Sequence, residues 1–207
     1  MKFPILASVI IFCLVINHAI RKNNRRQQAL EDSFWERERQ ANATRRQSLD
    51  GLNYIKIPLS ELPLDLLPDN ETIQGYVETV RALAETAIVN LTGYTNTDLK
   101  LQYGAPNITL LTQYDQNYTV LVSTLQLWAD ALLKDGHTEE AVKIMEFAVS
   151  VETDVSRTYY RLAEYYLSLG RPEELSRLTQ TAQKLRSSNR DQILRQLASL
   201  SASEPQE

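Results

Sequence analysis

The sequence contains little cysteine, histidine, glycine or proline, and these absences already limit the fold and the chemistry. Among 207 residues there are one cysteine, two histidines, six glycines and seven prolines. So few glycines and prolines cannot supply the many turns of a β-sandwich or β-barrel. A single cysteine, Cys13, allows neither a disulfide within the chain nor a cysteine metal site. We therefore expect an all-α protein.

Motifs for catalysis are also missing. His18 and His137 have no Cys or His neighbour at the spacing of metal ligands. The chain has no phosphate-binding loop, no nucleophile elbow and no metal-binding helix motif. Adjacent acidic residues such as Glu139 and Glu140 lie at predicted helix starts, where carboxylates complement the helix dipole. We expect no enzyme, and hence no catalytic residue, cofactor, metal or small-molecule substrate.

Charge is distributed unevenly along the chain. The net charge is −4, but residues 21–46 carry eight basic and four acidic side chains, whereas residues 47–207 carry thirteen basic and twenty-two acidic ones. An acidic domain repels the phosphate backbone, so we expect no nucleic acid partner. The basic segment suits a neck that lies near anionic lipid headgroups.

The first twenty residues contain the longest apolar run. From Phe3 to Ile20 there are eighteen residues, which as a helix would be about 27 Å long, enough to cross the hydrocarbon core of a bilayer. A cleaved signal peptide is the alternative, but Asn17 stands where a small residue is required for cleavage after Ala19. We therefore predict that residues 1–20 form a single transmembrane anchor.

The charges that flank this run predict its orientation. Arg21, Lys22, Arg25 and Arg26 follow it, whereas only Lys2 and the terminal amine precede it. Because basic flanks stay on the cytoplasmic side, we expect a single-pass membrane protein whose soluble domain is cytoplasmic. The alternative is an extracytoplasmic or lumenal domain.

Five Asn-x-Thr triplets favour that alternative. Chance predicts about 1.6 in a chain of this composition, and in a eukaryotic lumen such triplets would be glycan acceptors. Asn and Thr also share loop and helix-cap positions, so the triplets can arise without any sugar. Both interpretations stay open for Asn42, Asn70, Asn90, Asn107 and Asn117.

Residues 21–50 are polar and compatible with a helix. Their only large apolar side chains are Leu30, Phe34, Trp35 and Leu49, which are too few for a core and too irregular for a coiled-coil seam. We predict a solvated basic juxtamembrane stalk. A position of the two aromatic residues at the membrane surface is the alternative.

Residues 51–121 have the least regular pattern. Three prolines between positions 58 and 68 exclude a long helix from the first part. Residues 71–90 then show an apolar stripe of helical period, with Asn70 as the expected N-cap. Residues 91–113 mix Gly, Pro, Thr and Asn, and are either a connector along the helices or a binding loop. We predict a divergent N-terminal part of a helical domain.

Two helical hairpins follow with a period of 34 residues. Gly136 and Gly170 are separated by that period, and each follows a segment with apolar residues at three- or four-residue spacing. Thr138 is the expected N-cap of the second helix in the first hairpin. The predicted units are residues 122–155 and 156–189, followed by a capping helix and tail at 190–207.

These hairpins resemble the tetratricopeptide repeat, a helix-turn-helix unit of 34 residues. The family pattern is carried in the first unit by Leu125, Trp128, Ala129, Leu132, Gly136, Ala141, Met145 and Ala148, and in the second by Tyr159, Leu162, Ala163, Tyr166, Gly170, Leu175, Thr179 and Ala182. Leu175, Thr179 and Thr153 depart from the small, aromatic and proline residues that the family favours. The resemblance covers about a third of the chain and implies a short α-solenoid. The whole layout is similar to that of bacterial membrane-anchored tetratricopeptide proteins.

In this family the first helices of successive units line a concave groove that holds peptide segments. The equivalent positions are Ser123, Gln126, Asp130, Leu133, Lys134, Arg157, Tyr160, Glu164 and Leu167. Gln126 and Asp130 replace the Lys and Asn with which chaperone-binding members hold a terminal carboxylate, so we expect a partly basic, partly apolar segment instead. The resemblance implies a membrane-tethered scaffold or adaptor that recruits a partner protein. The alternative is an extracytoplasmic, glycosylated structural or assembly subunit of a membrane complex.

Overall fold

The structure, a computed structural model, describes residues 3–202 of the chain. Within this range every regular element is helical, which confirms the all-α prediction. The described residues fall into two compact units. Unit 1 contains residues 3–47 and 95–108, and unit 2 contains residues 48–94 and 109–202.

The predicted transmembrane anchor coincides with side chains that mostly lie outside the described set, which omits those of residues 1–11 and 13–15. The backbone from Phe3 onward is helical. Among the side chains that are described, no helix has a stretch long and apolar enough to span a bilayer.

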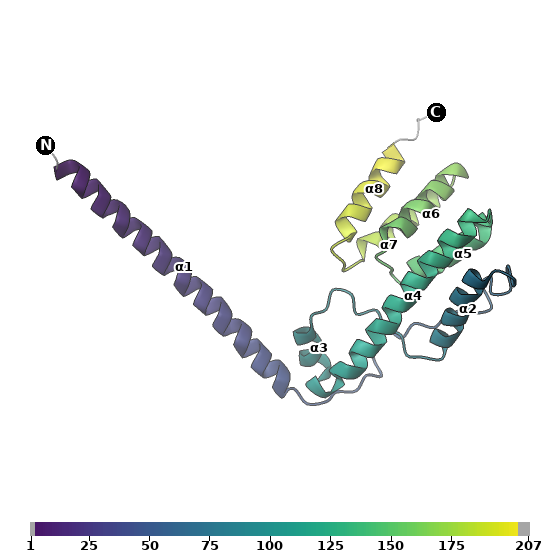
Figure 1. Ribbon diagram of the computed structural model, residues 1–207, viewed down its shortest axis with the longest axis horizontal. Coiled ribbons are helices and arrows are strands. Elements are labelled where there is room, and N and C mark those ends of the chain that lie inside the picture. The colour runs from purple at the N-terminus through teal and green to yellow at the C-terminus, as the bar shows by residue number, and fades with distance from the viewer. Residues whose placement is uncertain (1–2, 203–207) are drawn as a thin grey trace. The chain divides into compact units, whose positions relative to one another are not determined.

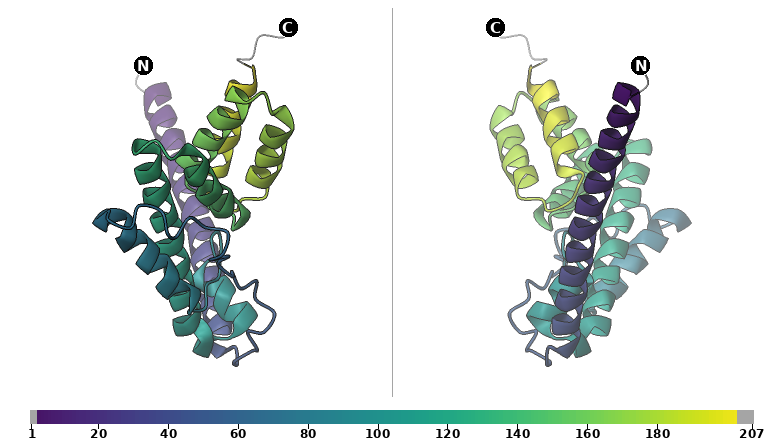
Figure 2. Two further views of the ribbon diagram at one scale, coloured as in Figure 1. Left: turned by 90° about the vertical axis from the view of Figure 1, so that its right-hand side faces the viewer. Right: turned by 90° about the vertical axis from the view of Figure 1, so that its left-hand side faces the viewer.

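Helix α1, Phe3–Ala43, is one uninterrupted helix of 41 residues (Figures 1 and 2). Most of the predicted stalk is therefore the second half of this helix, and its side chains from Ile16 to Arg37 are exposed. At about 1.5 Å per residue, Phe34 lies roughly 21 Å along the helix from Ile20. This distance argues against a position of Phe34 and Trp35 at the surface of a membrane that the first twenty residues would cross.

The end of α1 is not a free stalk, because two short helices pack against it in unit 1. These are α3, Asn96–Tyr103, and the 3₁₀-helix η1, Ala105–Asn107. Sequence analysis expected a connector or a binding loop here. A capping box starts α3: the Thr95 hydroxyl accepts a hydrogen bond from the Asp98 amide, and the Asp98 carboxylate accepts one from the Thr95 amide.

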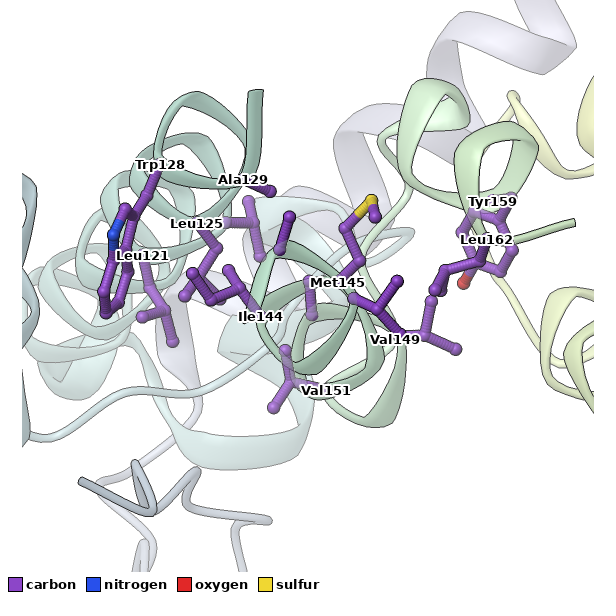
Figure 3. Close-up of a cluster of buried hydrophobic side chains, with 14 of the residues drawn as sticks. Leu121, Leu125, Trp128, Ala129, Ile144, Met145, Val149, Val151, Tyr159 and Leu162 are labelled. Atoms are coloured by element: carbon purple, nitrogen blue, oxygen red, sulfur yellow. The ribbon is translucent and has the colours of Figure 1, made fainter. Parts of the chain in front are cut away.

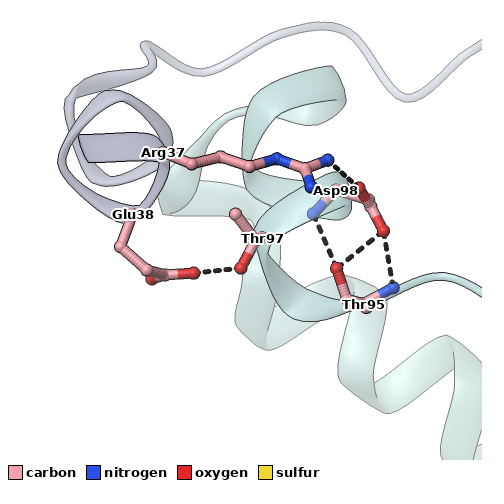
Figure 4. A network of polar contacts seen from close by, with 5 residues as sticks. All are labelled: Arg37, Glu38, Thr95, Thr97 and Asp98. Atoms are coloured by element: carbon pink, nitrogen blue, oxygen red, sulfur yellow. Dashed lines mark hydrogen bonds and ion pairs between the residues drawn. The ribbon is translucent and has the colours of Figure 1, made fainter. Parts of the chain in front are cut away.

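Charged side chains fix α3 to α1 (Figure 4). The Arg37 guanidinium lies 2.6 Å from the Asp98 carboxylate, and the Glu38 carboxylate accepts hydrogen bonds from the Thr97 hydroxyl and from Lys100. The Thr97 and Lys100 donors hold the pKa of Glu38 below its usual range. The prediction of a fully solvated stalk therefore fails over its last residues.

Unit 2 is a stack of helices (Figures 1 and 2). α5 packs against α6, α6 against α7, and α8 against both α6 and α7. The two hairpins follow the predicted repeats, although the first helix begins fourteen residues before residue 122. The helices are α2, Glu71–Ala84; α4, Ile108–Lys134; α5, Thr138–Ser150; α6, Ser156–Ser168; α7, Pro172–Gln183; and α8, Arg190–Ala202.

The apolar stripes predicted from helical spacing form one core (Figure 3). Trp128 of α4, Met145 of α5 and Tyr159 of α6 are all buried, with Leu125 and Leu162 beside them. Small Ala129, Ala141 and Ala148 are buried at positions where large side chains would separate the helices.

The two turn glycines have a conformational role. Gly136 has φ +84° and Gly170 has φ +63°, in the left-handed region that side chains with a Cβ rarely adopt. The expected N-cap is wrong by one residue. His137 occupies that position, without a side-chain hydrogen bond to the helix, and Thr138 is the first helical residue.

The predicted helix 71–90 ends early, at Ala84. Residues 87–90 are not helical, and other segments bond the backbone carbonyls of Ala87 and Ile88. The Ile55 amide donates to the Ile88 carbonyl at 2.9 Å, and the Asn117 amide group donates to the Ala87 carbonyl at 2.9 Å. We call residues 87–94 the strap.

The strap contacts the ends of both hairpins. The Asn90 side-chain amide lies 2.9 Å from the Tyr118 hydroxyl and 3.3 Å from the carbonyl of Val151, in the turn after α5. Four residues later, the Tyr94 ring lies 4.7 Å from the Arg186 guanidinium, just after α7. The strap therefore ties together the turns that follow α5 and α7.

Two buried tyrosines hold the turn between the hairpins. The Tyr118 hydroxyl of α4 donates to the Glu152 carbonyl at 2.9 Å, and the Tyr159 hydroxyl of α6 donates to the Thr153 carbonyl at 2.9 Å. Burial raises the pKa of both phenols, so the folded state favours their neutral form. Their contribution to stability is fully present below the unfolded-state pKa of about 10 and is lost as the pH rises above it.

Replacement of Tyr118→Phe should lower the free energy of unfolding at pH 7 by about 1–2 kcal/mol, because it removes the hydroxyl that bonds the turn. The same variant should lose stability less steeply than the wild type above pH 10. Urea unfolding at pH 7 and pH 11 measures both effects. Tyr76→Phe, at a half-buried position on α2, is the control. Equal pH slopes for Tyr118→Phe and the wild type would contradict the assignment.

Candidate partner-binding surface

Helices α4, α5 and α6 surround a hollow of about 560 Å³ on unit 2. Four of the nine predicted groove residues line it: Asp130, Leu133, Lys134 and Glu164. The other lining residues are Thr138, Val142, Met145, Arg161 and Tyr165. The hollow thus joins the first helices of the two hairpins, α4 and α6, and the helix between them.

The inner part of the hollow is apolar. Met145 is 2% exposed and Val142 is 6% exposed, so their side chains form its floor. Leu133 and the Tyr165 ring are half-buried beside them. Binding is favoured when an apolar side chain displaces the water above a floor of this kind.

The charged groups at the rim are mostly paired with one another. Asp130 lies 2.9 Å from Arg157, and Glu164 lies 3.2 Å from Arg161. Lys134 is exposed and has no ion pair with any described residue. The carboxylates are therefore already neutralised within the chain, and the uncompensated charge at the rim is positive.

The remaining predicted groove residues lie outside the hollow. Ser123 is exposed, and Arg157 contacts the rim through Asp130. Tyr160 and Leu167 are half-buried against the core, on a helix that packs against α8. α8 takes the place of a further first helix, so the second hairpin offers less open surface than the family mapping assumed.

Gln126 has a structural contact instead. Its carbonyl oxygen accepts a hydrogen bond from the Thr158 hydroxyl at 2.6 Å, which links α4 to α6. Its amide nitrogen and the Tyr160 hydroxyl are buried without a hydrogen-bond partner among the described residues. A buried polar group without a hydrogen bond destabilises the folded state until a binding partner or a water molecule bonds to it.

Sequence reasoning missed the residues of α5 and the outer side of α6. The family mapping uses only first helices, so it passed over Val142 and Met145. A signal was present, because α5 has apolar residues over more of its circumference than one buried face requires. Val142 and Met145 of this helix form the floor of the hollow.

Four of the five Asn-x-Thr asparagines use their side-chain amides inside the fold. Asn107 is fully buried, and its Nδ2 donates to the carbonyls of Gln47 and Tyr103 at 2.8 and 2.7 Å. The same nitrogen donates in Asn90 and Asn117, which bond the turn after α5 and the strap. Asn70 caps α2 and donates to Asp135.

A glycan is attached through this same nitrogen, so sugar at these four positions would remove internal hydrogen bonds. The fifth asparagine, Asn42, is exposed near the end of α1. Loop and cap roles therefore explain most of the excess of triplets. The glycan interpretation keeps structural support at Asn42 alone.

The substitution Asn107→Asp tests the structural role. A carboxylate would face the Gln47 and Tyr103 carbonyls without a hydrogen to donate, at a penalty of about 1–3 kcal/mol for each unsatisfied group. We expect protease cleavage near residue 47 to accelerate. Asn42→Asp makes the same chemical change at an exposed position and should cleave like the wild type. Resistance of Asn107→Asp to cleavage would show that these bonds are not needed.

Comparisons with protein-family models, with curated proteins and with solved structures gave no match.

Proposed function

We propose that unit 2 is a tetratricopeptide-like adaptor that binds a segment of a partner protein in the hollow between α4, α5 and α6. The proposal further holds that residues 1–20 anchor the chain in a membrane, so that the partner is recruited there. One observation supports it: the first helices of two successive hairpins border an open, apolar-floored hollow.

The chemistry of the hollow favours one kind of segment. Its volume of about 560 Å³ suits one or two side chains, and the floor of Val142 and Met145 favours an apolar one. Lys134 stands at the rim without a carboxylate partner among the described residues. We infer a segment with a bulky apolar side chain and an acidic residue close to it. The internal pairs of Asp130 and Glu164 make a basic segment less suitable.

The membrane part of the proposal is supported by α1. The helix continues without a break from the apolar run into the basic neck that begins at Arg21. Basic side chains at that position lie within reach of anionic headgroups if the run crosses the bilayer. The same charges favour a cytoplasmic location for unit 2.

The hollow is tested by placing a photo-crosslinking amino acid at Leu133 in the full-length chain within cells. We expect it to capture a partner, and we expect Lys134→Glu to weaken the capture several-fold because it repels the acidic residue of the segment. Lys143→Glu is the matched control: it makes the same charge change at an exposed lysine of α5 that does not line the hollow.

Equal capture by Lys134→Glu and Lys143→Glu would reject the assignment of the rim. Capture from position 143 instead of position 133 would move the binding surface to the other side of α5. Circular dichroism of each variant shows whether its helices are retained.

The second candidate is an extracytoplasmic structural subunit, with Asn42 as its remaining acceptor site. Ser188 is exposed in unit 2, so in a Cys13→Ser background Ser188→Cys gives one accessible thiol. We expect a membrane-impermeant thiol reagent to label it only after cell lysis. Labelling in intact cells would favour the extracytoplasmic alternative and would place the partners of the hollow on that side.

A further inference from the structure

Helix α1 has an apolar face that no other part of the described chain covers. Its large apolar side chains between 41% and 64% exposed include Phe12, Ile16, Ile20, Leu30 and Phe34. Beyond Ile20, outside the run that we propose to lie in a membrane, a helix surrounded by solvent gains little stability from packing, and helical stability in proteins comes mostly from a packed face. The exposed part of α1 therefore lacks the packing partner that such a helix normally has.

The five side chains lie on one side of the helix. With about 100° of rotation per residue, positions 12, 16, 20, 30 and 34 fall within roughly 80° of one another. The gap between Ile20 and Leu30 is filled on the same side by Asn23 and Gln27, which are uncharged. From Ile16 to Phe34 the spacing alternates between four and three residues, which is the spacing of positions a and d in a coiled coil.

This pattern extends beyond the segment that was predicted to be too irregular for a seam. That prediction began at Arg21 and considered only large apolar residues. The continuous helix brings Ile16 and Ile20 onto the same face as Leu30 and Phe34, and polar residues occupy the two positions between them.

The charges beside this face would be complementary between two copies of the helix. In this register Gln27 occupies position a, Arg26 is the g residue before it, and Glu31 is the e residue that follows Leu30. Residues g and e of the next heptad meet across a parallel, in-register pair of helices. In two copies of α1, Arg26 of one would therefore face Glu31 of the other, on both sides of the seam.

We propose that α1 pairs with α1 of a second copy of this chain, as a parallel, in-register dimer with a seam from Ile16 to Phe34. Asn23 at position d and Gln27 at position a would meet their own equivalents, which favours one register over others. Beyond Phe34 the chain covers the same face itself: Ala41 is fully buried where α1 packs on α3 and η1. The seam therefore ends where intramolecular packing begins.

The proposal rests on α1 alone, and its test is independent of the hollow in unit 2. Gln27→Cys places a thiol on the seam, and Gln28→Cys places the same substitution one residue away, outside it. Both are made in the full-length chain with Cys13→Ser, reconstituted in phosphatidylcholine vesicles and oxidised with copper phenanthroline. We expect Gln27→Cys to give a disulfide-linked dimer several-fold faster than Gln28→Cys.

The charge pair is tested in the Gln27→Cys background. Arg26→Glu should slow the cross-linking because it opposes two carboxylates, and the further change Glu31→Arg should restore the rate. Equal rates at positions 27 and 28, or no dimer from position 27, would overturn the proposal. A double variant that stays as slow as Arg26→Glu would exclude the parallel register.

Discussion

The hydrogen bond from the Tyr118 hydroxyl to the turn after α5 is the contact on which the geometry of unit 2 depends. That turn contains Glu152 with φ +59°, a conformation that a residue with a side chain adopts only when its surroundings hold it there. Tyr159 and Asn90 bond the same turn from α6 and from the strap. These bonds join α4, α6 and the strap to the turn that connects the two hairpins.

The hairpins could be predicted because their information is local. Apolar residues at helical spacing define the buried faces, and Gly136 and Gly170 mark the turns that require positive φ. The hollow was only partly predictable. Asp130 and Leu133 follow from the mapping of first helices, whereas Met145 belongs to α5, a second helix that this mapping leaves out. No local pattern shows that α8 packs against α6 and α7.

The rest of the fold depends on contacts between distant residues. Residues 87–90 have a helical pattern but are not helical, and their backbone carbonyls bond Ile55 and the side chain of Asn117. In α3 the capping box of Thr95 and Asp98 was a readable signal that the glycines and prolines around it obscured. The Asn-x-Thr triplets were ambiguous in sequence because one side chain, such as Asn107, can serve either a glycan or a buried cap.

Unit 1 is built from two segments that the ribosome synthesises at different times. Arg37 and its partner Asp98 are 61 residues apart. At about 5–20 residues per second, α3 is synthesised roughly 3–12 s after the end of α1. During that interval α3 cannot yet pack against α1, and Ala41 is not yet buried. The contacts of Arg37 and Glu38 with α3 can therefore form only after the whole of α1 and the segment that follows it have been made.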